Sequence, residues 1–66
     1  MRIMVNGQYR EVSAGLSIAE LLEEMSLEPL RVAVERNKQL VPRDRHAETA
    51  LAEADELEIV TLVGGG

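Results

Sequence analysis

Apolar and polar residues alternate along five short segments of the chain, which is the pattern of strands that bury one face. These segments are residues 2–6, 8–12, 31–36, 39–41 and 57–63. Asn6-Gly7 separates the first two, and both positions tolerate the positive φ angles of a two-residue hairpin. Asn37-Lys38 separates the third from the fourth and is interpreted as a turn. Pro42 lacks a backbone N–H, which places the 39–41 strand at a sheet edge.

The apolar spacing changes to three and four residues between the second and third segments, which predicts one amphipathic helix. Its apolar stripe consists of Ile18, Leu21, Leu22 and Met25. Ser17 followed by Glu20 forms a capping box at the start of the helix, and Leu16 is placed to pack against Leu21 across that cap. Pro29 prevents the helix from continuing.

Strands arranged around a single helix predict an α+β fold in which the helix covers one face of a sheet. We expect one domain over residues 1–63 and a glycine tail over residues 64–66. Residues 43–56 are polar and irregular, with at most a short helical turn. The helix-facing side chains are expected to form the core, namely Ile3, Val5, Ile18, Leu21, Leu22, Val32, Val34, Leu57 and Ile59.

The same alternation leaves Met4, Val60 and Leu62 on the face opposite the core. If the first and last strands are neighbours, these side chains form an exposed apolar patch, and such patches often mark a partner site. The alternative is that they are scattered surface residues, which are common in soluble proteins.

The composition limits the classes of function. The net charge is −5, and seven basic residues scattered among twelve acidic ones argue against nucleic-acid binding. No segment approaches the ~18 apolar residues of a membrane helix, and the start of the chain lacks a secretory signal pattern. The chain contains no cysteine, which is compatible with a reducing cytoplasm. We therefore expect a cytoplasmic protein that binds neither nucleic acid nor membranes.

Side chains suited to catalysis or metal binding are scarce. His46 is the only histidine, so the several His or Cys ligands of a zinc site are lacking. Its charged neighbours predict that His46 lies in solvent on a loop. No glycine-rich phosphate loop lies between a strand and a helix. We therefore expect no catalytic residue, no metal site and no intrinsic cofactor.

The glycines Gly64, Gly65 and Gly66 are the most informative feature of the chain. Without Cβ atoms they can thread a narrow tunnel, and Gly66 offers an unhindered terminal carboxylate. A carboxylate is a poor electrophile, but joining it to AMP removes its charge and supplies a leaving group. A sulfur or amine nucleophile can then displace the AMP. The alternative is a frayed tail without a function.

The whole chain resembles the ThiS family of sulfur carriers for thiamine thiazole synthesis, within the ubiquitin-like β-grasp superfamily. The resemblance rests on "MRIMVNG", "SIAELLEEM", "VAVERNKQLVPR" and "DELEIVTLVGGG". Two loop positions differ, because the family often has Gly-Asp where Ala54-Asp55 stands and an aromatic residue near His46. The resemblance implies a β-grasp fold, with a mixed sheet of four to five strands and one main helix on one face.

The resemblance also implies a mechanism in which the protein is a carrier rather than an enzyme. An ATP-dependent adenylyltransferase of the ubiquitin-activating type (ThiF-like) activates the Gly66 carboxylate. A cysteine desulfurase or persulfide donor supplies sulfur, and the resulting thiocarboxylate donates it to thiazole synthase (ThiG-like). Gly64 and Gly65 give the tail its reach, and the Met4, Val60 and Leu62 surface docks both partners. ATP serves the activating enzyme.

Other functions are open at this stage. The small subunit of molybdopterin synthase resembles the chain in fold and tail chemistry, but it tends to be longer between the helix and the last strand. A ubiquitin-like modifier, or a carrier for another sulfur pathway, would use the same tail. A β-grasp binding module would have an inert tail. The sequence assigns no sulfur donor, no oligomeric state and no role for Arg43 or His46.

Overall fold

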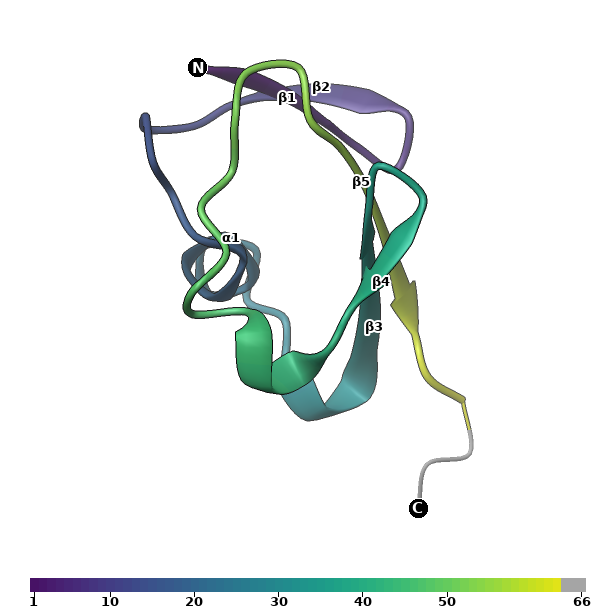
Figure 1. The fold of residues 1–66 in the computed structure, drawn as a ribbon. Helices are drawn as coiled ribbons and strands as arrows, with labels where there is room; N and C mark the ends of the chain where they lie inside the picture. Colours follow the sequence, from purple (N-terminus) through teal and green to yellow (C-terminus); the bar gives the residue numbers. More distant parts are fainter. Residues whose placement is uncertain (64–66) are drawn as a thin grey trace.

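The computed structural model describes residues 1–63 of the chain. Within them, five strands form one sheet in the order β2-β1-β5-β3-β4. The strands are β1 (Arg2–Val5), β2 (Gln8–Glu11), β3 (Val32–Arg36), β4 (Gln39–Val41) and β5 (Glu56–Thr61). β1 and β5 are parallel, and the other neighbouring strands are antiparallel. One α-helix, α1 (Ile18–Glu24), covers one face of this mixed sheet (Figure 1), as the sequence predicted.

Both predicted turns adopt left-handed backbone angles. The φ angles are 50° at Asn6 and 80° at Gly7, and 51° at Asn37 and 71° at Lys38. Positive φ at both central residues is the conformation that matches the twist of a two-residue hairpin. Asn6 is therefore part of a turn rather than of the first strand, which ends one residue earlier than the alternation suggested.

The start of α1 carries the predicted capping box. The Glu20 N–H donates to Ser17 Oγ at 3.1 Å, and the Ser17 N–H donates to Glu20 Oε1 at 2.9 Å. Short 3₁₀ turns follow at η1 (Pro29–Arg31), which leads into β3, and at η2 (Arg43–Arg45), which follows β4. β4 lies at the sheet edge, as Pro42 predicted.

All the side chains predicted for the core are buried between the sheet and α1. Val12, Leu16 and Leu51 join them. Leu51 lies in the segment expected to be polar, and its N–H donates to the Leu16 carbonyl at 2.8 Å. This segment therefore closes one end of the core. Truncation of a core side chain to Ala should lower the free energy of unfolding by about 2–5 kcal/mol.

His46 is buried, with 4% of its surface exposed, so the prediction of a solvated loop histidine is wrong. Its Nε2 lies 3.1 Å from the Val41 carbonyl oxygen, so we assign the donated proton to Nε2. Nδ1 is buried without a hydrogen-bond partner. The His46 carbonyl accepts from the Ala19 N–H at 3.1 Å, which joins the segment after η2 to the start of α1. The imidazole thus fills core volume.

Candidate functional site

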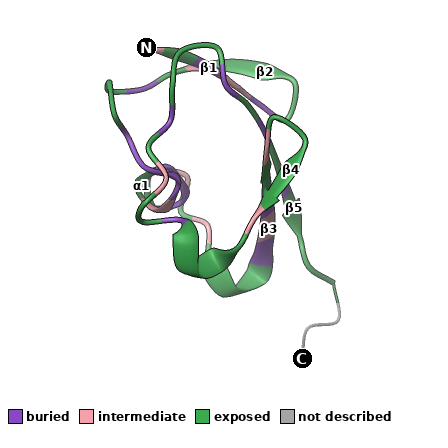
Figure 2. Cartoon of the chain, viewed as in Figure 1, coloured by how far each residue is buried: buried purple, intermediate pink, exposed green. Residues whose placement is uncertain are grey.

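β5 lies in the middle of the sheet and leads directly toward the predicted tail. Leu57 and Ile59 are buried in the core, whereas Glu58 and Val60 are exposed on the other face of the strand. Figure 2 shows how buried and exposed stretches are distributed along the chain. This alternation follows from the two-residue period of a strand. The core therefore anchors the strand, and the opposite face of the strand is displayed to solvent.

Asn6 extends the pairing of β5 beyond the end of β1. Its Oδ1 accepts from the Ile59 N–H at 2.8 Å, and its Nδ2 donates to the Ile59 carbonyl at 3.1 Å. Its own N–H donates to the Leu57 carbonyl at 2.9 Å. The side-chain amide thus takes the place of strand backbone, a role that its turn propensity did not indicate.

The backbone is held in place one residue beyond β5, because the Leu62 N–H donates to the Arg31 carbonyl at 2.7 Å. Val63 follows and is almost fully exposed. The predicted sulfur-carrying residue Gly66 and the tail residues Gly64 and Gly65 lie outside the described residues, and their roles stay predictions.

Met4, Val60 and Leu62 lie on the outer face of the sheet, but in two separate areas. Met4 is half-buried on β1 opposite Glu56, the first residue of β5. Val60 is four residues further along β5, which corresponds to about 13 Å of strand. Val60 is 54% exposed and Leu62 is 51% exposed. The first and last strands are neighbours, but the three side chains do not form one patch. The apolar surface at the tail end consists of Val60 and Leu62 without Met4.

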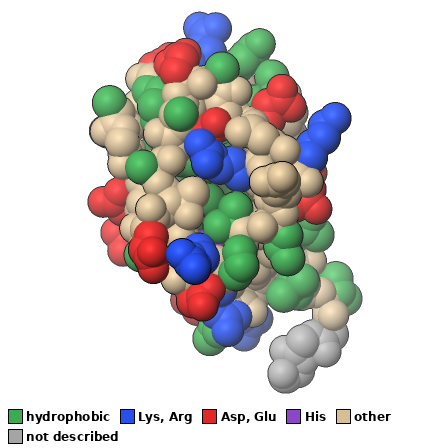
Figure 3. All heavy atoms as spheres, viewed as in Figure 1, with side chains coloured by type: hydrophobic (Ala, Val, Ile, Leu, Met, Phe, Trp, Pro, Cys, Tyr) green, Lys and Arg blue, Asp and Glu red, His purple; other side chains and the backbone are tan. Residues whose placement is uncertain are grey.

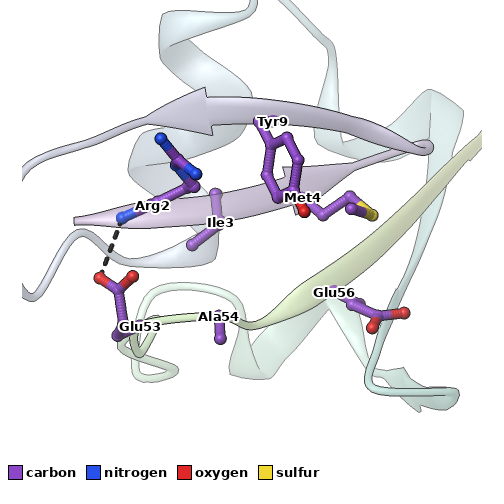
Figure 4. Close-up of a pocket in the computed structure, with 7 residues that line it drawn as sticks. All are labelled: Arg2, Ile3, Met4, Tyr9, Glu53, Ala54 and Glu56. Carbon is purple, nitrogen blue, oxygen red and sulfur yellow. Dashed lines mark hydrogen bonds between the residues drawn. The ribbon is translucent and has the colours of Figure 1, made fainter.

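A shallow pocket of about 270 Å³ opens beside Met4 on the outer face (Figure 4). Its lining residues are Arg2, Ile3, Met4, Tyr9, Glu53, Ala54 and Glu56. The Arg2 guanidinium carbon lies 4.9 Å from the centre of the Tyr9 ring. The backbone N–H of Arg2 donates to Glu53 Oε1 at 3.0 Å. None of these lining side chains is a nucleophile paired with a base.

A buried carboxylate fixes the loop before β5. Asp55 Oδ2 accepts from Arg36 Nε and from the Ala52 N–H, both at 2.8 Å, and Oδ1 accepts from Asn37 Nδ2 at 3.1 Å. Burial raises the pKa of Asp55, but these hydrogen bonds and the Arg36 charge together lower the pKa below its usual value of 3.8. The ionised carboxylate therefore stabilises the start of β5.

Ala54 precedes this carboxylate and has a φ of 71°. A left-handed conformation costs about 1–2 kcal/mol for a residue with a Cβ and almost nothing for glycine. This conformation accounts for the glycine that the resembled family often has at the same position. Ala54 therefore adopts this conformation at an energetic cost.

Across residues 1–63, no group of three or more His, Cys, Asp and Glu side chains is arranged to hold a metal ion. His46 is buried, and Arg43 is exposed in η2. None of the helices in that range is long and apolar enough to cross a membrane. The candidate functional features of the described residues are the exit of β5 and the outer face of the sheet.

Comparisons with known proteins agree with the resemblance. Residues 3–66 match the model of the ThiS family. Over 66 residues the chain is 41% identical to a protein of Paramagnetospirillum magneticum named thiazole synthase. This match covers all of the chain but only 20% of the thiazole synthase. It is 30% identical to the sulfur carrier protein ThiS of Escherichia coli, with full coverage of both chains.

The crystal structure of the thiamine biosynthesis protein ThiS from Geobacter metallireducens matches with a TM-score of 0.87. That protein is 29% identical, and the match covers 100% of both chains. The chain therefore spans the full length of two of these relatives and about a fifth of the thiazole synthase.

Proposed function

The chain belongs to the ThiS family, and we propose that it is a sulfur carrier protein of thiamine biosynthesis. Gly66 carries the sulfur, because one oxygen of its carboxylate is exchanged for sulfur to give a thiocarboxylate. The protein acts as a co-substrate of its partners and performs no catalysis of its own. We place it in the cytoplasm, where its activating partner has access to ATP.

One observation supports this proposal most directly. β5 is the central strand, and its backbone is fixed by hydrogen bonds as far as Leu62, only four residues before Gly66. A rigid base that is followed, after Val63, by three glycines without Cβ atoms suits delivery of a terminus into the active site of another protein. The match to the family model extends to residue 66, so it includes this segment.

The proposed chemistry takes place in two partners. An adenylyltransferase of the ubiquitin-activating type joins the Gly66 carboxylate to the α-phosphate of ATP and releases pyrophosphate. The outer sulfur of a persulfide, which a cysteine desulfurase or another persulfide donor supplies, then attacks the acyl carbon, and AMP leaves. A thiol cleaves the S–S bond of the resulting acyl disulfide, forms a disulfide with the donor sulfur and releases the thiocarboxylate. The thiocarboxylate passes its sulfur to thiazole synthase. The similarity to a fifth of a protein named thiazole synthase supports this enzyme as the recipient.

The outer face of the sheet is the proposed docking surface for these partners. Val60 and Leu62 lie nearest to the tail, so they would contact whichever enzyme holds Gly66 in its active site. Met4 lies at the other end of the same face, beside the pocket it shares with Tyr9, and would contribute a second, separate contact. Exposed apolar side chains of this kind often mark partner sites.

Mass spectrometry of the intact protein tests the proposal. Incubation with the cognate adenylating enzyme, ATP and a sulfur donor should yield a species in which one oxygen has been exchanged for sulfur. A variant that lacks Gly65 and Gly66 should fold normally and remain unmodified. Persistent absence of the sulfur-bearing species from the full-length protein would refute the carrier function.

The choice of pathway has its own test. Expression of the chain should restore growth without thiamine to a bacterial strain that lacks its own sulfur carrier for thiazole synthesis. The molybdopterin alternative predicts instead the rescue of a molybdenum-cofactor defect in the corresponding strain. Rescue of the second strain and not of the first would assign the carrier to that pathway.

A further inference from the structure

Two glutamates face each other across the outer side of the sheet. Glu35 on β3 is the direct register partner of Glu58 on β5, and both side chains are exposed. Directly opposite side chains in an antiparallel pair have Cβ atoms about 4.5–5.5 Å apart, and like charges at such positions are destabilising. The central pair of strands thus carries a local repulsion.

No basic side chain of residues 1–63 neutralises this repulsion through an ion pair. The ion pairs of that range use other carboxylates, such as Glu11, Glu24 and Asp55. Lys38 lines the same shallow hollow as Glu58 but lies within 4 Å of no carboxylate in the range. The two carboxylates are therefore available to an external cation.

Exposed apolar side chains flank the glutamate pair on two sides. Leu40 on β4 is the register partner of Glu35 on its other side and is 65% exposed. Val60 follows Glu58 on the same face of β5, and Leu62 follows Val60. The space-filling view shows hydrophobic side chains near the end of β5 (Figure 3). Exposed apolar side chains that lie together mark a protein-binding surface, and charged groups beside them add specificity for a partner of complementary charge.

We propose that the activating enzyme inserts an arginine side chain between Glu35 and Glu58. A guanidinium presents several N–H donors in a plane and bridges two carboxylates better than the compact ammonium of lysine. Leu40 and Val60 pack against its stem and exclude water. This inference rests on the proposed carrier function, and it specifies the charge and shape of the partner that the outer face recognises.

The proposal predicts opposite effects on folding and on binding. Glu58→Gln and Glu35→Gln relieve the repulsion, so the melting temperature of the free protein should rise by about 2–5 °C. The same substitutions should weaken binding to the purified activating enzyme about fivefold each. Their binding should also depend less on salt concentration than that of the unmodified protein. Calorimetric titration at low and at high salt measures the binding affinity and its dependence on salt.

Two further variants make the test specific. Glu23→Gln removes the same charge from the exposed side of α1 and should bind as the unmodified protein does. Glu58→Asp retains the charge on a shorter side chain and should bind more tightly than Glu58→Gln. Unchanged binding by Glu35→Gln and Glu58→Gln, or equal weakening by Glu23→Gln, would overturn the proposal.

The formation of the sulfur-bearing species separates this inference from the proposed function. If the unmodified protein gains sulfur while the two glutamate variants bind normally, only the arginine contact is refuted. If the unmodified protein gains no sulfur, the carrier function fails and the arginine contact fails with it.

Discussion

Arg36 Nε donates to Asp55 Oδ2 at 2.8 Å and joins β3 to the loop that precedes β5. The Asp55 side chain is buried, whereas that of Arg36 is about a third exposed. Solvent therefore screens the guanidinium in part, and the pair is worth less than a fully buried one. Its importance lies in its position, because β5 continues into the tail.

Asp55→Asn should lower the free energy of unfolding by about 2 kcal/mol at neutral pH, since an uncharged amide replaces a carboxylate that accepts from three donors. The pKa of Asp55 is lowered in the folded protein. Its stabilisation is therefore complete above the usual pKa of 3.8, which applies to the unfolded chain, and is lost as the pH falls through the lower folded pKa.

Urea denaturation across a range of pH checks this prediction. The stability difference between Asp55→Asn and the unmodified protein should shrink below about pH 4. Glu23→Gln, on the exposed side of α1, should show little difference at any pH. A difference for Asp55→Asn that stays constant into strong acid would mean that the charge of Asp55 is not responsible.

Ala54→Gly should stabilise the protein by about 0.5–1 kcal/mol. Glycine relieves about 1–2 kcal/mol of left-handed strain but increases the entropy of the unfolded chain, which offsets part of the gain. Thermal denaturation should show a higher melting temperature. Ala52→Gly is the matched control, because Ala52 has no positive φ angle and glycine there should be destabilising. A loss of stability in both variants would contradict the strain at Ala54.

Asn6→Gly should lower stability by about 1–2 kcal/mol, because it preserves the turn but removes both side-chain hydrogen bonds to Ile59. Amide hydrogen exchange at Ile59 should become faster. Asn6→Asp keeps the acceptor for the Ile59 N–H, so its stability should lie between that of Asn6→Gly and that of the unmodified protein. Unaltered exchange at Ile59 in Asn6→Gly would show that the amide does not hold β5.

Val60→Glu should weaken binding to the activating enzyme and change stability by less than about 0.5 kcal/mol, because Val60 faces solvent. Binding titration and thermal denaturation measure the two effects. Gln8→Glu adds the same charge at the far edge of the sheet and should bind normally. A large fall in melting temperature for Val60→Glu would mean that this side chain packs within the fold.

His46→Ala should lower stability by about 2–4 kcal/mol, since it leaves a cavity beneath the segment that covers the start of α1. The exposed neighbour Ala47→Gly serves as a control for changes in this loop and should have a far smaller effect. Equal stability of His46→Ala and the unmodified protein would contradict a packing role for His46 and would support a solvated loop histidine.

The period of apolar residues was sufficient to predict the strands, the helix and the inward side of each strand, because these depend on neighbours close in sequence. Asn6 and Ile59 are 53 positions apart, and Arg36 and Asp55 are 19 apart. Such contacts exist only after the strands have been arranged side by side. His46 was misassigned for the same reason, since its burial depends on how the segment after η2 lies over α1 and not on its charged neighbours.

The placement of β5 also affects how the protein is made. β1 and β2 form one hairpin and β3 and β4 form another, and within the sheet only β5 lies between them. A ribosome therefore synthesises the strand that unites the two hairpins just before it synthesises the glycines. A chain truncated before residue 56 would lack the strand that pairs with both hairpins, and it would lack the glycines as well. Completion of the sheet and synthesis of residues 64–66 thus occur at the same stage of translation.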